Sequence, residues 1–96
     1  MTREEFEKYF EDCNDDYLKI EELTISLQTS RPDLCAFLLL DRLCPASTDM
    51  VTSAGHDVIY LDIDIDELLA VATDEDIKNL SRCGVHYEEE SLALYV

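Results

Sequence analysis

Basic residues are scarce in this sequence. Its 96 residues include 7 Lys and Arg against 23 Asp and Glu, which gives a formal net charge of −16 at pH 7. A field of this sign repels phosphates and anionic lipid headgroups. The composition therefore excludes direct binding to nucleic acid and to anionic membrane surfaces.

Long apolar runs and turn-forming residues are also few. The longest apolar run, 34–40, is far shorter than the roughly 20 residues of a membrane span, and residues 1–6 lack the basic and then apolar order of a signal peptide. Two Gly and two Pro in a chain with 47% hydrophobic residues argue against disorder. We expect one folded domain, 1–96, that is cytoplasmic and has no membrane contact.

Recognisable metal and catalytic motifs are missing. The four cysteines, at positions 13, 35, 44 and 83, form no C-x-x-C pair, so we expect free thiols and no zinc site. Asp62, Asp64 and Asp66 alternate as at the start of a calcium-binding EF-hand loop, but Glu67 stands where that loop needs Gly and Thr73 where it needs Glu. We therefore expect a binding protein rather than an enzyme, with no cofactor and no metal.

The first half of the chain has helical periodicity. Thr2 and Glu5 have the spacing of a capping box, and the apolar residues after them predict a one-sided helix that ends near Asn14. The apolar spacing over 15–27 predicts a second helix. Ser30 followed by Pro and Asp predicts the start of a third helix, 30–43, which is apolar on most sides and should therefore be the central, buried one.

The second half of the chain changes its pattern. Residues 46–56 have no sustained period and predict a loop, whereas apolar residues alternate over 57–65 and predict a strand. On that strand Ile59, Leu61, Ile63 and Ile65 should face the core, with Tyr60, Asp62 and Asp64 in solvent. We expect one core of Phe37, Leu38, Leu40, Ile59, Leu61 and Ile63.

The remaining elements are short. Asp64 with Glu67 and Thr73 with Asp76 predict two capped helical segments, and Gly84 predicts the end of the second one. Two short strands, 85–87 and 91–96, flank an acidic turn. This order predicts an α+β fold in which several short helices pack on a small antiparallel sheet of two to three strands.

Negative charge is concentrated between Arg42 and Lys78. That interval holds nine acidic residues and no Lys or Arg. Alternate residues of a strand lie about 6.6 Å apart, which is of the same order as the spacing of phosphates along nucleic acid. The acidity could serve only solubility, but −16 is well beyond the magnitude of about 2 to 8 that keeps a small domain soluble. We therefore predict a binding surface that imitates DNA.

The candidate partner-binding residues fall into two groups. The first group lies in the middle of the chain and comprises Asp62, Asp64, Asp66, Glu67, Asp74, Glu75 and Asp76. The second group is the acidic turn near the C-terminal end, made of Glu88, Glu89 and Glu90.

Beyond its charge and size, the sequence carries a likeness in its second half. The stretches 72–77, 82–85, 87–90 and 92–94, in a short and strongly acidic chain, resemble uncharacterised phage and prophage proteins. The chain also resembles small phage-encoded inhibitors that mimic DNA, including acidic anti-CRISPR and anti-restriction proteins. Those inhibitors share charge rather than a motif, so the resemblance transfers no residue roles.

The resemblance implies a viral protein that acts as a stoichiometric inhibitor in the host cytoplasm. Its partner would be a basic, nucleic-acid-binding host defence complex. The runner-up hypothesis is an immunity or antitoxin protein that plugs the basic active site of a nuclease toxin, where electrostatic attraction would act in the same way. A homodimer is also left open.

Overall fold

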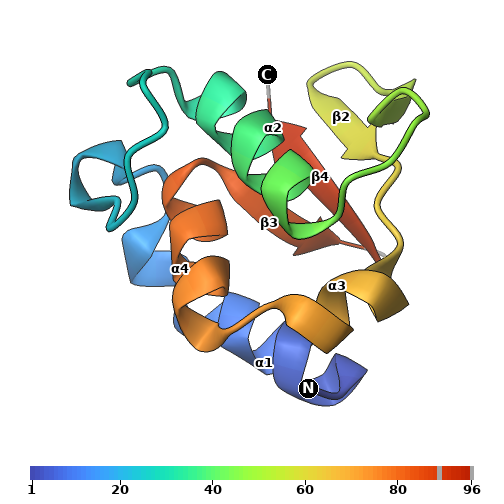
Figure 1. Ribbon diagram of the computed structural model, residues 1–96, viewed down its shortest axis with the longest axis horizontal. Coiled ribbons are helices and arrows are strands. Elements are labelled where there is room, and N and C mark those ends of the chain that lie inside the picture. The colour runs from blue at the N-terminus through green and yellow to red at the C-terminus, as the bar shows by residue number, and fades with distance from the viewer. Residues whose placement is uncertain (89, 96) are drawn as a thin grey trace.

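The chain alternates short helices and strands. The computed structural model describes residues 1–88 and 90–95. Within them the order is α1 (Arg3–Asp12), the 3₁₀ turns η1 (Asn14–Asp16) and η2 (Ile20–Glu22), α2 (Pro32–Leu43), β1 (Val51–Ala54), β2 (Val58–Leu61), α3 (Ile65–Val71), α4 (Asp74–Arg82), β3 (Val85–Glu88) and β4 (Ser91–Tyr95) (Figure 1).

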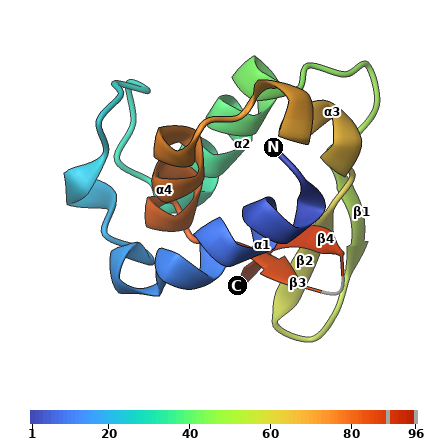
Figure 2. The ribbon, with the colours of Figure 1, turned by 90° about the horizontal axis from the view of Figure 1, so that it is seen from below.

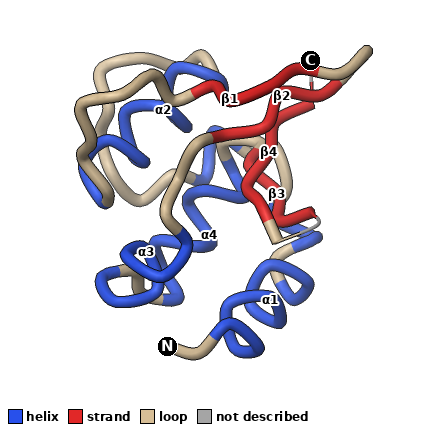
Figure 3. Tube along the Cα trace, turned by 90° about the vertical axis from the view of Figure 1, so that its right-hand side faces the viewer, coloured by secondary structure: helices blue, strands red, loops and turns tan. Residues whose placement is uncertain are grey.

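The strands form one antiparallel sheet in the order β1-β2-β4-β3. The α+β prediction is confirmed, with four strands in place of two to three. The additional strand is β1, so the predicted loop over 46–56 is wrong at Val51–Ala54. Its sequence is too short and too polar to signal a strand, and its pairing with β2 supplies the structure. Helices α2, α3 and α4 lie to one side of the sheet (Figure 3).

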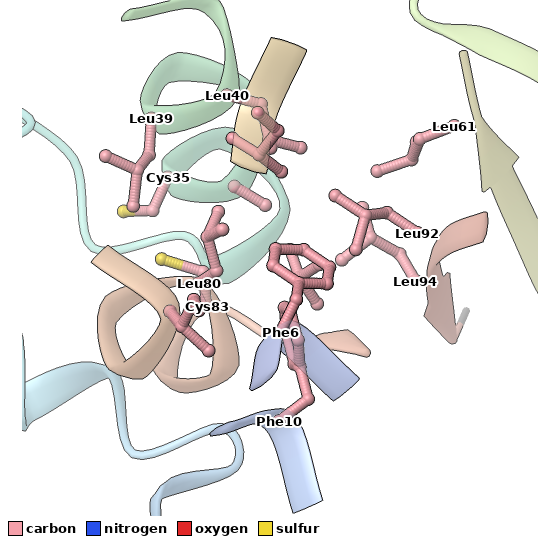
Figure 4. Packing of buried hydrophobic residues seen from close by; sticks show 14 of the residues in the cluster. Phe6, Phe10, Cys35, Leu39, Leu40, Leu61, Leu80, Cys83, Leu92 and Leu94 are labelled. Atoms are coloured by element: carbon pink, nitrogen blue, oxygen red, sulfur yellow. The ribbon is translucent and has the colours of Figure 1, made fainter. Parts of the chain in front are cut away.

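The core lies between the sheet and the helices. Leu92 and Leu94 of β4 are buried on the inner face of the sheet, where they meet Phe6 of α1, Leu40 of α2 and Leu80 of α4 in one cluster (Figure 4). Phe6 stacks edge to face on Phe10, with ring centroids 5.1 Å apart. Burial of these large side chains is the main stabilising contribution to the fold.

Helix α2 is less enclosed than its composition predicts. It packs through the stripe Cys35, Ala36, Leu39 and Leu40, while Leu38 on its outer face is 43% exposed. The prediction of a core position is therefore wrong for Leu38. It is confirmed for Leu40 and Leu61, whereas three other predicted positions are only partly buried and pack against the cluster: Phe37, Ile59 and Ile63.

The helix predicted over 15–27 is absent, and two 3₁₀ turns occupy part of that segment. Its local backbone bonds close only short turns, and two of its N–H groups donate to α4. The Leu18 N–H donates to the Ser81 carbonyl at 3.0 Å, and the Thr24 N–H donates to Asn79 Oδ1 at 3.2 Å. Leu18 also has a φ of +60°, which breaks helical continuity.

The strand predicted over 57–65 is shorter than expected. Strand β2 ends at Leu61, the Asp62 N–H donates to the Met50 carbonyl, and Asp64 is the N-cap of α3. Asp62 and Asp64 are exposed, as predicted, but they do not lie on a strand face. Ile65 is buried because it begins α3, where the helix turns its apolar side to the core.

Candidate functional site

The first helix joins the other helices at both of its ends. The N-terminal amine of Met1 donates to the Leu69 carbonyl at 3.0 Å, and Ser81 Oγ donates to the carbonyl of Cys13 at 3.2 Å. The start of α1 therefore lies beside α3, and its end lies beside the end of α4. Helices α1, α3 and α4 are seen together from below in Figure 2.

Acidic residues occupy the first turns of all three helices. Their carboxylates are placed at the positive ends of the helix dipoles, where negative charge is favourable. We call this set the acidic end; it comprises Glu4 and Glu5 of α1, Asp64, Asp66 and Glu67 of α3, and Asp74, Glu75 and Asp76 of α4.

Some of these carboxylates cap the N-termini of their own helices. Asp64 Oδ1 accepts the N–H groups of Asp66 at 3.0 Å and Glu67 at 3.3 Å. Asp76 Oδ2 accepts the Thr73 N–H at 2.9 Å in a capping box, as its spacing predicts. Removing such a carboxylate would weaken the helix as well as the surface charge.

The capping box of α1 has an electrostatic consequence. Glu5 accepts the Thr2 N–H at 3.1 Å, and Thr2 Oγ1 accepts the Glu5 N–H at 3.1 Å. The Thr2 backbone N–H donates to the carboxylate and favours its charged form, so this bond, with a smaller contribution from the Thr2 side chain, lowers the pKa of the Glu5 carboxyl. Glu5 is therefore held as an anion at the edge of the acidic end.

Two further carboxylates are engaged in ion pairs. Asp66 lies 3.2 Å from the Arg3 guanidinium in an exposed pair, and Glu75 lies 3.6 Å from that of Arg82. Arg82 also lies 3.6 Å from Asp16 of η1. Exposed pairs of this kind contribute little to stability, so the partial neutralisation of Asp66 can be reversed by a competing cation.

The least constrained carboxylates are those of Asp62, Glu67 and Asp74. All three are exposed. Among the described residues, Asp74 Oδ1 accepts only the neighbouring Glu75 N–H at 3.0 Å, and no hydrogen bond or ion pair engages the carboxylates of Asp62 and Glu67. These three positions allow the surface charge to be changed without loss of a cap.

Of the second predicted group, Glu90 lies beside α1. Glu88 lies 3.0 Å from His86 Nε2, Glu90 is exposed with a φ of +62°, and Glu89 lies outside the described residues. Glu90 shares a surface hollow of about 420 Å³ with Arg3, Glu4, Glu7 and Tyr87. Asp66, Glu90 and α1 thus meet around Arg3, whose pKa is raised chiefly by Asp66 and to a smaller extent by Glu90.

Sequence reasoning missed the contribution of α1 to this surface. Glu4, Glu7 and Glu11 are exposed along one side of the helix, at successive rises of about 4.5 and 6 Å. Their signal in the sequence is the polar face opposite the apolar stripe of a capped helix. It indicates exposure, but the position of that face beside Glu90 depends on tertiary packing.

Comparisons with other proteins add no named relative, because no protein-family model, curated protein or solved structure matches this chain. Within residues 1–88 and 90–95, no three or more His, Cys, Asp or Glu side chains are grouped so that they could hold a metal ion. In the same part of the chain, every helix is too short or too polar to cross a membrane.

Proposed function

We propose that this protein is a stoichiometric inhibitor that occupies the nucleic-acid-binding surface of a basic partner protein. The observation that carries the proposal is the placement of carboxylates in the first turns of three helices, with α1 packed on α3 and α4 and with Glu4, Asp66 and Glu90 lying around Arg3. The protein would act by binding and would catalyse no reaction. In line with the phage inhibitors that the sequence resembles, the partner would be a host defence complex in the cytoplasm.

The mechanism is competition for cationic side chains. Carboxylates separated by one helical turn present charges at a spacing similar to that of phosphates, so a channel of Lys and Arg can pair with either. Long-range attraction between a protein with a net charge of −16 and a basic surface raises the association rate, and salt screens that attraction. Binding of this protein and of nucleic acid would therefore be mutually exclusive and most rapid at low salt.

The experiment begins with capture of the partner from a host lysate by the tagged protein and its identification by mass spectrometry. Competition between this protein and DNA or RNA for the purified partner is then measured at two salt concentrations. A nucleic-acid-binding defence subunit supports the proposal, and capture of a small nuclease toxin would favour the immunity-protein alternative. Simultaneous binding of nucleic acid and this protein would refute mimicry.

A matched pair of triple variants tests where the charge acts. The test variant neutralises three exposed carboxylates of the first predicted group, two in the acidic end and one just before it in sequence: Glu67→Gln, Asp74→Asn and Asp62→Asn. The control makes the same change in net charge at exposed positions elsewhere: Glu21→Gln, Glu22→Gln and Asp57→Asn. At low salt the test variant should associate about tenfold more slowly and the control less than about threefold more slowly. Equal losses would assign the effect to net charge alone.

A further inference from the structure

An apolar groove opens between the start of α2 and the ends of β2 and β4. Its volume is about 450 Å³, within the range of about 300 to 1,000 Å³ found for ligand sites. Its floor and walls include Leu18, Phe37, Ile59, Leu94 and Tyr95, and its one charged lining residue is Asp33. Figure 1 shows two elements that border the groove, the N-terminal half of α2 and the end of β4.

The groove joins buried and exposed apolar surface. Leu94 is almost fully buried, and Phe37 and Ile59 pack against the core. At the rim, Leu18 is 50% exposed and Tyr95 is 58% exposed. An occupant would therefore cover apolar rim side chains and contact the core floor, which is the arrangement of an anchor pocket.

The rim residue Leu18 is held in a disfavoured backbone conformation. Its φ is +60°, and its N–H donates to the Ser81 carbonyl at 3.0 Å. Its side chain lies over Gly84, where an added Cβ would be 2.8 Å from Leu18 Cδ2. The fold thus keeps a half-exposed leucine at the groove despite the backbone strain. Strain of this kind persists at binding sites, where the surrounding structure imposes it.

Charge selects the kind of occupant. A second copy of the chain would bring another −16 to the contact and would be repelled. A cationic partner would be attracted. The rim itself is not a ring of acidic residues, because the basic residues Lys19 and Arg31 are sequence neighbours of the lining residues Leu18 and Pro32. The attraction therefore comes from the net charge of the whole chain and from Asp33.

We infer that the groove binds a cationic segment of the partner protein that inserts two or three apolar side chains between Leu18, Phe37 and Ile59. This inference rests on the proposed function and deepens it. Distributed charge governs the association rate and partner choice more than affinity, whereas buried apolar anchors slow dissociation. The acidic end and the groove would then divide these two tasks.

The test uses synthetic peptides as probes, so it does not depend on the partner. A Lys/Leu peptide carries Leu at every third and fourth position among lysines, and a Lys/Ser peptide of equal charge replaces each Leu with Ser. Methyl and amide NMR shifts locate binding, and titration gives Kd. The Lys/Leu peptide should shift Leu18, Ile59 and Leu94 and keep its affinity in salt. Equal binding of both peptides, or shifts confined to the acidic end, would overturn the inference.

Two single substitutions at exposed positions, one in the groove and one outside it, test whether the peptide binds at the groove. Leu18→Asn removes the apolar side chain at the rim and introduces a residue type that tolerates positive φ, so the fold is preserved. It should weaken the Lys/Leu peptide about tenfold. Val51→Thr, which removes an exposed apolar group from β1, should change Kd less than twofold. An unchanged Kd in Leu18→Asn would refute the groove.

Other occupants give distinct results. Groove shifts with decanoate and none with the Lys/Leu peptide would assign a small lipid, and concentration-dependent dimerisation abolished by Leu18→Asn would assign a second copy; either result overturns the inference. If the peptides do not bind the groove but the triple variant (Asp62→Asn, Glu67→Gln, Asp74→Asn) still competes less well with nucleic acid, the proposed function is retained and the groove inference is rejected. If the groove binds the peptide and that triple variant competes normally, the proposed function fails.

Discussion

The buried amide of Asn79 should be a major contributor to the stability of the fold. Its side chain is 1% exposed and connects α4 to the irregular segment before α2. Asn79 Oδ1 accepts the Thr24 N–H at 3.2 Å and Arg82 Nη1 at 3.1 Å, and Asn79 Nδ2 donates to Thr24 Oγ1 at 2.9 Å. Asn79→Ala would remove all three bonds at once.

The size of the effect follows from what would be left without a partner. A neutral hydrogen bond contributes about 0.5–1.5 kcal/mol and one to a charged group about 1.5–3, and water can replace part of each loss at Thr24, which is exposed. We expect Asn79→Ala to lower the free energy of unfolding by about 2–4 kcal/mol. For a domain of this size the melting temperature should fall by about 10–25 °C.

Urea denaturation measures the loss, and a double-mutant cycle with Thr24→Val assigns it. Coupling of Asn79 and Thr24 should be about 0.5–1.5 kcal/mol, because Thr24→Val removes the bond from Asn79 Nδ2 to Thr24 Oγ1 and keeps the bond from the Thr24 backbone N–H. Lys78→Ala, exposed on the same helix, should stay within about 0.5 kcal/mol of the wild type. A loss below about 1 kcal/mol for Asn79→Ala, with no coupling, would refute the reasoning.

Four further predictions concern backbone strain, titration and thiol reactivity. Gly84→Ala should cost about 1–3 kcal/mol in urea titrations, because Gly84 has a φ of +91° and the new Cβ meets Leu18; a loss that Leu18→Gly does not reduce would contradict this. Burial raises the pKa of the Cys83 thiol to about 12, so the unfolded chain releases that proton at a lower pH than the folded chain. The free energy of unfolding should therefore fall as pH rises from 9 towards 12, and the fall should be shallower in Cys83→Ala. Cys44 is the half-buried thiol among three buried ones, and it should be the first to react with a disulfide reagent in the native protein. The lowered pKa of Glu5 means that its contribution is present above the unfolded value of 4.5 and lost as pH falls through the folded value, so the melting temperatures of wild type and Glu5→Gln should converge below pH 4.

Local signals predicted the starts of α1 and α4 correctly. The capping boxes at Thr2 and Thr73 form as their spacing predicts, because each requires only a side chain and a backbone group within one turn. The start of α2 is a near miss. Its N-cap is Arg31 rather than Ser30, and Thr29 Oγ1 accepts the Arg31 N–H at 3.2 Å.

Long-range bonds account for the elements that sequence reasoning missed. The apolar spacing over 15–27 fits a helix, but Ser81 and Asn79 offer partners 55 or more residues away. Strand β1 gains its structure from β2. For the candidate surface, exposure of Asp62 and Asp64 could be predicted from periodicity, whereas the meeting of Glu90 with Glu7 could not.

The position of β4 in the sheet has a consequence for folding. It is the last strand in sequence, yet it lies between β2 and β3, and Val58 pairs with Tyr95 across 37 positions. Until residues 91–95 arrive, β1 and β2 form an isolated hairpin with an unpaired inner edge, and β3 has no neighbour. Open edges of this kind are sites of intermolecular pairing. Nascent or truncated chains that lack β4 should therefore aggregate, even though the net charge of −16 makes the folded molecules repel one another.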